Sequence, residues 1–479
     1  MKGTKINLQL QDLSDAEFAI MHESVLRLLS EYGVLFEEAR ARALLTKAGN
    51  QVDREGRVHL KPEFVESMLA LVPRDGFTMY GRDESKTLRV VVDEISFRPS
   101  TGAPLVLDYA TRRSREATMD DARMMATLTD GLDGFDMVNS VVTPADAPGS
   151  MANVHRFINA HRHALKPSDI TVMTGQEVNA IAQVAAAIRG GEKDLREKPL
   201  TAVDVAMITP LRCAREQVEA LMACAKWRLP IEVLTSPAMA VSAPITLAGS
   251  AALAMAEVIA ALCLVYLIAP GLGIINTARI SPTNMRTTAY NYGAPELGMG
   301  SVLVGACSAR YRIPSNLYGF GTVAKVADAQ AAMEKTFPAL LMALGRPHMI
   351  TGGGILDNGL ITSPEQLVID HEAIRFIKRI RQPITIDEES IGIDVLKNGM
   401  ASDGCLLAEE HTVKHLRAGE MVDCSLEQWC SYSQWEEEGA PDLFDRAHRK
   451  VEEILASHTV APFDADVEKA IDRIVKATS

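Results

Sequence analysis

The sequence has few cysteines, few aromatic residues and no excess of positive charge. Its 479 residues include seven cysteines, an odd number, scattered without a CxxC pair. That pattern is typical of a reduced cytoplasmic protein and not of a disulfide framework. Lys and Arg total 49 against 62 Asp and Glu, a net charge of −13. A nucleic-acid binder needs the opposite balance along one face, so we expect no nucleic-acid partner.

We also predict neither a targeting segment nor a membrane span. The N-terminus carries no apolar run of the kind found in signal peptides. Residues 251–269 form the longest apolar run, but Glu257 sits near its middle. A charge at that depth of a bilayer costs about 2.5 kcal/mol or more. We therefore predict a buried core helix here, and a cytoplasmic protein without a membrane partner.

What the sequence does contain is a regular alternation of strand-like and helical segments. Eight strands alternating with helices predict an α/β fold of the (β/α)8 TIM-barrel type. A doubly wound open sheet is the alternative, but its six or so strands would leave two runs unexplained. The predicted strands are 135–143, 169–175, 202–209, 231–238, 272–279, 314–320, 348–353 and 403–408. The predicted helices are 151–165, 176–190, 212–227, 246–269, 294–311, 324–345 and 363–381.

The flanks of the barrel have their own patterns. Ser14 and Glu17 form a capping box before a helical stretch. Two β-rich runs within 89–108 flank a Pro-Ser-Thr-Gly-Ala-Pro turn and suggest a hairpin. We therefore divide the chain into an N-terminal α+β cap, the barrel, and C-terminal helices that pack on it. The predicted bounds are 1–116, 117–424 and 425–479.

Few candidates for chemistry follow from the residues alone. The predicted strand ends are mostly neutral, and we expect no cluster of Asp, Glu, Lys and His to converge on them. Gly352, Gly353 and Gly354 could cradle a phosphate or simply turn the chain. Glu296, just after Pro295, could face the barrel mouth or only cap a helix. We predict no bound metal, and keep one zinc alternative made of His411, His415, Cys424 and Cys430.

Seven collinear segments of the sequence resemble the trimethylamine methyltransferase family of corrinoid-dependent enzymes. The resemblance extends over about four-fifths of the chain. It implies a TIM barrel and methyl transfer from a methylated amine to the Co(I) corrinoid of a separate small protein. The segments are 100–136, 236–260, 284–298, 326–344, 352–372, 409–420 and 434–456.

One departure from the family narrows the implied substrate. Members that act on trimethylamine carry pyrrolysine late in the barrel, whereas the corresponding stretch here, 319–325, reads GFGTVAK. The chain is thus similar to the pyrrolysine-free branch that demethylates quaternary amines such as glycine betaine. Loss of a methyl group from a quaternary nitrogen leaves a neutral amine, so positioning and not acid–base catalysis is the main requirement. Carnitine, proline betaine, butyrobetaine and choline stay open as substrates, as does a non-catalytic quaternary-amine binder.

The implied substrate suggests which residues to examine. Aromatic faces hold a quaternary ammonium, and a cationic or amide donor holds a carboxylate. We expect a homo-oligomer that works with a cognate corrinoid protein. The candidates for substrate binding are Phe97, Arg98, Asn276, Arg279, Phe320 and His348. The candidates for contact with the corrinoid are Tyr290, Tyr292, Gly352, Gly353 and Gly354, with Glu296 as a possible catalytic residue.

Overall fold

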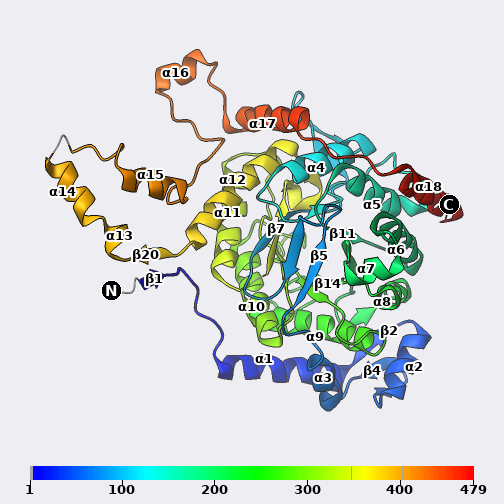
Figure 1. The fold of residues 1–479 in the computed structure, drawn as a ribbon. Helices are drawn as coiled ribbons and strands as arrows, with labels where there is room; N and C mark the ends of the chain where they lie inside the picture. The colour runs from blue at the N-terminus through cyan, green and yellow to red at the C-terminus, as the bar shows by residue number, and fades with distance from the viewer. Residues whose placement is uncertain (1–3, 347, 402–403, 479) are drawn as a thin grey trace.

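Parallel strands surrounded by helices form the centre of the protein (Figure 1). The computed structural model describes residues 4–346, 348–401 and 404–478. A five-stranded sheet has the sequential order β10-β11-β12-β14-β15, and a three-stranded sheet has the order β16-β17-β7. These strands are β7 (Ser96–Pro99), β10 (Val138–Asn139), β11 (Ser168–Thr171), β12 (Thr201–Ala206), β14 (Ile231–Thr235), β15 (Ile274–Ala278), β16 (Asn316–Tyr318) and β17 (Met349–Gly353).

The two sheets meet at both of their edges. A parallel bridge joins Asn276 of β15 to Ser315, which precedes β16. At the other seam the amide of Asp136 donates to the carbonyl oxygen of Phe97 at 2.8 Å. The ladders of the described residues do not run unbroken around the ring, so the arrangement is α/β and TIM-barrel-like. The sequential strand order also excludes the doubly wound alternative, whose order reverses at a switch point.

One predicted strand and the predicted hairpin are wrong. The predicted strand 403–408 is not found: residue 403 lies outside the described residues, residues 404–408 form no strand, and Leu407 is 80% exposed. The eighth strand is instead β7, which pairs in parallel with β17 and not with the run that follows it. Its four residues are all buried, which is typical of a strand covered on both faces. The second half of the expected hairpin, β8 (Leu105–Leu107), pairs with β9 (Ser114–Glu116) and β19 (Ile361–Thr362).

Helices cover the outside of the strands, and the seven predicted helices are confirmed to within about five residues at each end. Local signals explain where they begin: Thr174 and Glu177 form a capping box at the start of α6, for example. The helices around the strands are α4 (Met119–Gly131), α5 (Ala152–His163), α6 (Gly175–Arg189), α7 (Glu192–Glu197), α8 (Arg215–Trp227), α9 (Leu247–Tyr266), α10 (Pro295–Tyr311), α11 (Ala329–Leu344) and α12 (Pro364–Arg381).

The apolar helix α9 is buried on every side, as predicted. The N-terminal elements pack against it from outside, so it lies between them and the strands. A helix in that position needs no polar face. The predicted capping box of Ser14 and Glu17 at the start of α1 is also confirmed. These N-terminal elements are α1 (Asp15–Arg27), the π-helical turn Leu28–Tyr32, β2 (Val34–Phe36), α2 (Ala39–Lys47), β3 (Gln51–Val52), β4 (Arg57–His59) and α3 (Pro62–Leu69), with β13 (Arg212–Cys213) pairing to β2.

A hairpin closes the amino end of the ring of strands. It consists of β5 (Phe77–Tyr80) and β6 (Thr87–Val90). Its buried side chains, Met79 among them, form one apolar cluster with residues at the starts of the strands, including Ala202 and Met349. Because this end is plugged, only the carboxyl end of the strands is left for a site.

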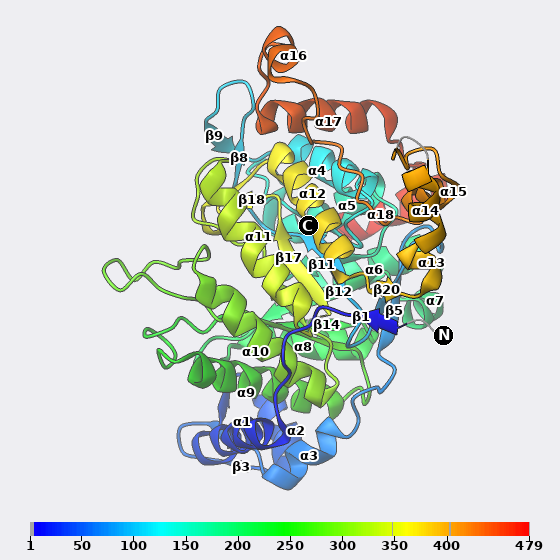
Figure 2. The same cartoon turned by 90° about the vertical axis from the view of Figure 1, so that its left-hand side faces the viewer.

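The C-terminal region is helical, and part of it leaves the body of the protein. Helix α17 (Leu443–Ser457) packs on α12 and α4, and α18 (Ala465–Thr478) packs on α6. Before them comes a segment, residues 384–401 and 404–437, that we call the arm. Figures 1 and 2 show it beside the barrel-like body, attached where β1 (Thr4–Ile6) pairs with β20. The arm comprises β20 (Ile384–Ile386), α13 (Glu388–Ile391), α14 (Ile393–Ala401), α15 (Glu410–Arg417) and α16 (Tyr432–Glu437).

Candidate functional site

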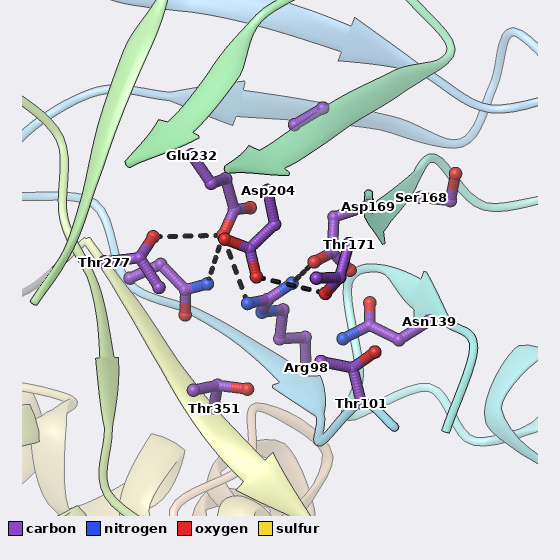
Figure 3. Close-up of polar contacts among 12 residues, drawn as sticks. Arg98, Thr101, Asn139, Ser168, Asp169, Thr171, Asp204, Glu232, Thr277 and Thr351 are labelled. Atoms are coloured by element: carbon purple, nitrogen blue, oxygen red, sulfur yellow. Dashed lines mark hydrogen bonds and ion pairs between the residues drawn. The ribbon is translucent and has the colours of Figure 1, made fainter. Parts of the chain in front are cut away.

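One guanidinium and three carboxylates lie inside the ring of strands (Figure 3). They are Arg98 of β7, Asp169 of β11, Asp204 of β12 and Glu232 of β14, each no more than 2% exposed. Side chains alternate between the two faces of a strand, and these four point to the interior. We call them the ion cluster. The expectation of neutral strand ends did not foresee this charged cluster, whose carboxylates lie within the strands themselves.

Hydrogen bonds hold the ion cluster in place. The Arg98 guanidinium contacts the Asp169 carboxylate, and its Nη2 lies 3.1 Å from Glu232 Oε2. That same oxygen accepts from Asn316 Nδ2 at 2.7 Å and from Thr277 Oγ1 at 3.1 Å. Charge-assisted bonds of this kind are stronger than neutral ones, so the cluster fixes neighbouring strands relative to one another.

The carboxylates outnumber the cation that pairs with them. Burial, together with the charge of Asp169, raises the pKa of Asp204 to about 6. Burial also raises the pKa of Glu232 to about 7, against the opposing effect of Arg98. Glu232 Oε1 and Asp204 Oδ1 accept no hydrogen bond within the described part of the chain. The cluster therefore holds a proton readily and carries an excess of negative charge.

The raised pKa of Glu232 predicts a pH-dependent stability. Its usual value is 4.5, so between about pH 4.5 and 7 the folded state binds more proton than the unfolded state. Stability from this group is present below pH 4.5 and falls as pH rises to 7, by on the order of 3 kcal/mol. Urea unfolding measures the free energy of unfolding at pH 5 and pH 8, and the decrease between the two should be smaller in Glu232→Gln than in the native chain. The exposed control Glu23→Gln should show the same decrease as the native chain. An equal decrease in Glu232→Gln would contradict a raised pKa of Glu232.

Arg279 and three tyrosines gather where β15 and β16 end. The Arg279 guanidinium carbon lies 4.7 Å from the centre of the Tyr318 ring. The ring centres of Tyr292 and Tyr318 are 5.2 Å apart, and the Tyr290 ring stacks on that of Tyr292 with ring centres 5.6 Å apart. The charge of Arg279 lowers the pKa of Asp204, so it stands next to the ion cluster. We call these four residues the mouth group.

The mouth group has unused binding capacity. Arg279 Nε is buried and donates no hydrogen bond to any residue that the structure describes. Tyr290 is 44% exposed whereas Tyr292 and Tyr318 are buried, so the group reaches solvent through Tyr290. A guanidinium beside aromatic faces can hold a carboxylate and a quaternary ammonium of one small zwitterion. Of the predicted residues, the structure thus brings together Arg279, Tyr290 and Tyr292, and it adds Tyr318, which sequence reasoning missed.

The other predicted substrate residues lie elsewhere. Phe97 and Phe320 are fully buried, their rings 6.4 Å apart, and Lys378 of α12 lies over Phe97. They therefore occupy the layer between strands and helices. His348 precedes β17, at the plugged amino end, where its Nδ1 lies 2.9 Å from the carbonyl oxygen of Glu94. Asn276 faces outward and donates to Ser308 of α10 at 2.6 Å.

The predicted glycine turn has protein partners of its own. Buried Lys335 of α11 donates through Nζ to the carbonyl oxygens of Phe320, Gly352 and Ile355. The amide of Gly354 donates to Asp370 Oδ2 at 2.7 Å. The turn thus surrounds a lysine with carbonyls, and a role for Gly352, Gly353 and Gly354 at a corrinoid stays a prediction.

The structure also places Glu296 and the residues of the zinc alternative. Glu296 is the second residue of α10, after Pro295, where a carboxylate favours the helix dipole; a catalytic role stays a prediction. The four residues of the zinc alternative do not assemble among the described residues. His411 and His415 lie together with Glu389, without Cys424 or Cys430.

Comparisons with known proteins agree over the whole chain. The family model "Trimethylamine methyltransferase (MTTB)" matches residues 4–478. Trimethylamine methyltransferase MttB of Desulfitobacterium hafniense is 28% identical over 98% of this chain and 94% of its own. Glycine betaine methyltransferase of the same species is 26% identical over 97% of this chain and 96% of its own. In structure, the monomethylamine methyltransferase MtmB of Methanosarcina barkeri aligns with a TM-score of 0.54 at 11% identity, covering 98% of this chain and 88% of its own.

Proposed function

Because this chain belongs to the trimethylamine methyltransferase family, whose members act with corrinoid proteins, we propose that it demethylates a quaternary amine. The methyl group passes to the Co(I) corrinoid of a separate protein. Glycine betaine is the first substrate we propose, with dimethylglycine as the product. The mouth group carries this proposal, because it pairs a cation with tyrosine faces at the open end of the strands.

Two observations support a quaternary amine over trimethylamine. The stretch 319–325 is made of standard residues, GFGTVAK, with no pyrrolysine. One relative along nearly the whole chain is named a glycine betaine methyltransferase. The proposal therefore takes its substrate class from the sequence and its binding mode from the mouth group.

In this binding mode the two ends of betaine meet different partners. Its carboxylate pairs with the Arg279 guanidinium, whose Nε lacks a partner among the described residues. Its trimethylammonium lies against the ring of Tyr290, the exposed tyrosine of the mouth group, where cation–π attraction holds it without a contacting carboxylate. The absence of a contacting carboxylate matters because such a group would stabilise the cationic substrate more than the transition state of methyl transfer, in which the positive charge on nitrogen is decreasing.

The bond changes need no acid–base group. The carbon–nitrogen bond breaks and its electron pair stays on nitrogen as dimethylglycine forms. The reduced corrinoid supplies the electron pair for the new bond to carbon. The protein orients one N–CH₃ bond towards the open side, an entropic contribution of several kcal/mol. The ion cluster, fully buried below, supplies negative potential that favours entry of a cationic head group.

A corrinoid protein requires access to the carboxyl end of the strands. Several loops that follow strands expose apolar side chains there, which supports a partner surface. They include Met173, Ile208, Val241, Ile245 and Met285. We also propose that the two sheets constitute one (β/α)8 barrel, supported by the backbone bridges at both seams.

The proposal is tested with the purified chain, a reduced corrinoid protein and a panel of amines. We expect the corrinoid absorbance to change to that of the methylated form with glycine betaine and not with trimethylamine. Carnitine, proline betaine, butyrobetaine and choline serve as alternatives in the same assay. Methylation with trimethylamine alone would contradict the substrate class.

The arm supports the proposed homo-oligomer. It leaves many large apolar side chains exposed, and a second copy of the chain would bury them. Light scattering should give a mass above the monomer, and Leu396→Asp combined with Met400→Asp should lower it. An unchanged mass, or a monomeric native chain, would contradict this role. The most exposed of these side chains are Ile393, Met400, Leu407, Met421, Trp429 and Tyr432.

A further inference from the structure

Two histidines and a glutamate converge within the arm, far along the chain from the mouth group. His411 and His415 lie one turn apart on α15, and their ring centres are 4.2 Å apart. Glu389 belongs to α13, and its Oε1 lies 2.9 Å from His415 Nε2. One ligand atom from each residue lies within 4.8 Å of the other two.

This geometry is close to that of a chelating site. A zinc ion binds imidazole nitrogen and carboxylate oxygen at about 2.0–2.2 Å with tetrahedral angles, so two ligand atoms of one ion lie about 3.3–3.6 Å apart. The ligand atoms of these three residues lie within 4.8 Å of one another, so side-chain rotations that move them by up to about 1 Å would bring them into range. Histidines at i and i+4 on a helix are a common zinc pair because both rings leave the same face.

The present contacts are ones that an ion would replace. His411 Nε2 lies 2.9 Å from the backbone oxygen of Glu389, and Lys414 Nζ lies 2.8 Å from Glu389 Oε1. A lysine ammonium already occupies the position next to the carboxylate that a cation would take. The Glu389 side chain is 52% exposed, so an ion can enter and water can complete its coordination.

We propose that Glu389, His411 and His415 bind one zinc ion that ties α13 to α15. The arm has little apolar core of its own, because its large apolar side chains are exposed. A cross-link between helices more than twenty residues apart restricts the unfolded arm and so stabilises its folded form. This site is separate from the mouth group and does not depend on methyl transfer.

Zinc titration of the metal-free full-length chain tests the site. Calorimetry and metal analysis should give one zinc per chain, and His411→Ala and Glu389→Gln should each weaken binding about 10-fold or more. The circular dichroism spectra of His411→Ala and Glu389→Gln should match that of the native chain. The matched control, Cys424→Ser with Cys430→Ser, should bind zinc as the native chain does.

A second measurement tests whether bound zinc stabilises the folded arm or only binds to its surface. Zinc should slow tryptic cleavage within 384–420 in the native chain and leave the rate unchanged in His411→Ala. The proposal is overturned if no zinc binds at 100-fold the protein concentration, if His411→Ala binds equally well, or if the cysteine control loses the ion.

Discussion

Arg98→Ala is expected to lower the free energy of unfolding at pH 8 by about 3–5 kcal/mol. The substitution leaves Asp169 and Glu232 buried without their guanidinium partner, inside a ring of strands that excludes water. Urea denaturation followed by circular dichroism measures the change. At pH 5 the loss should be smaller, because Asp204 and Glu232, with pKa values raised to about 6 and 7, are then largely protonated.

The matched control for this variant is Arg89→Ala. Arg89 lies on β6 and pairs with Glu94 in an exposed contact, which contributes little. A change below about 1 kcal/mol is expected there. An Arg98→Ala chain as stable as the Arg89→Ala chain at pH 8 would show that the ion cluster is not what holds the strands together.

Arg279→Ala is expected to lower kcat/KM for glycine betaine about 10- to 100-fold, since it removes a charge-assisted contact with the carboxylate worth about 1.5–3 kcal/mol. Choline has the same ammonium and no carboxylate. Whatever activity the native chain has with choline, Arg279→Ala should therefore retain it. The measurement is initial-rate kinetics of corrinoid methylation with both substrates.

Arg286→Ala is the control for Arg279. It removes an arginine from the same loop, but Arg286 is exposed and lies outside the mouth group. Its kinetics should match the native chain. A fall of equal size for betaine and choline in Arg279→Ala would show that the arginine supports the fold of the mouth and does not select the carboxylate.

Much of the fold follows from local patterns in the sequence. Seven of the eight strands and seven of the surrounding helices were predictable, because buried parallel strands read as short apolar runs and helices begin at capping residues such as Thr174. The eighth strand was not, because β7 is four residues long and lies beside a proline-rich turn that resembles a hairpin. Its partner, β17, lies some 250 residues later, a distance that no local signal spans.

The site was predictable only in part. Arg279, Tyr290 and Tyr292 follow one strand closely, so the sequence indicates that they could face the same mouth. Arg98 was a candidate, but its carboxylate partners were missed, because a residue such as Asp204 in TAVDVA or Glu232 in IEVLT is a single charge within an apolar strand. A lone charge in an apolar strand is nevertheless a usable signal, because burying it requires a partner from another strand.

The most direct test follows a labelled methyl group through the reaction. Betaine deuterated on its N-methyl groups is mixed with the purified chain and a reduced corrinoid protein, and both products are measured by mass spectrometry. We predict that dimethylglycine and CD₃-corrinoid appear in equal amounts and only when all three components are present. A native, folded chain that yields no labelled corrinoid from betaine or any other quaternary amine would contradict the account.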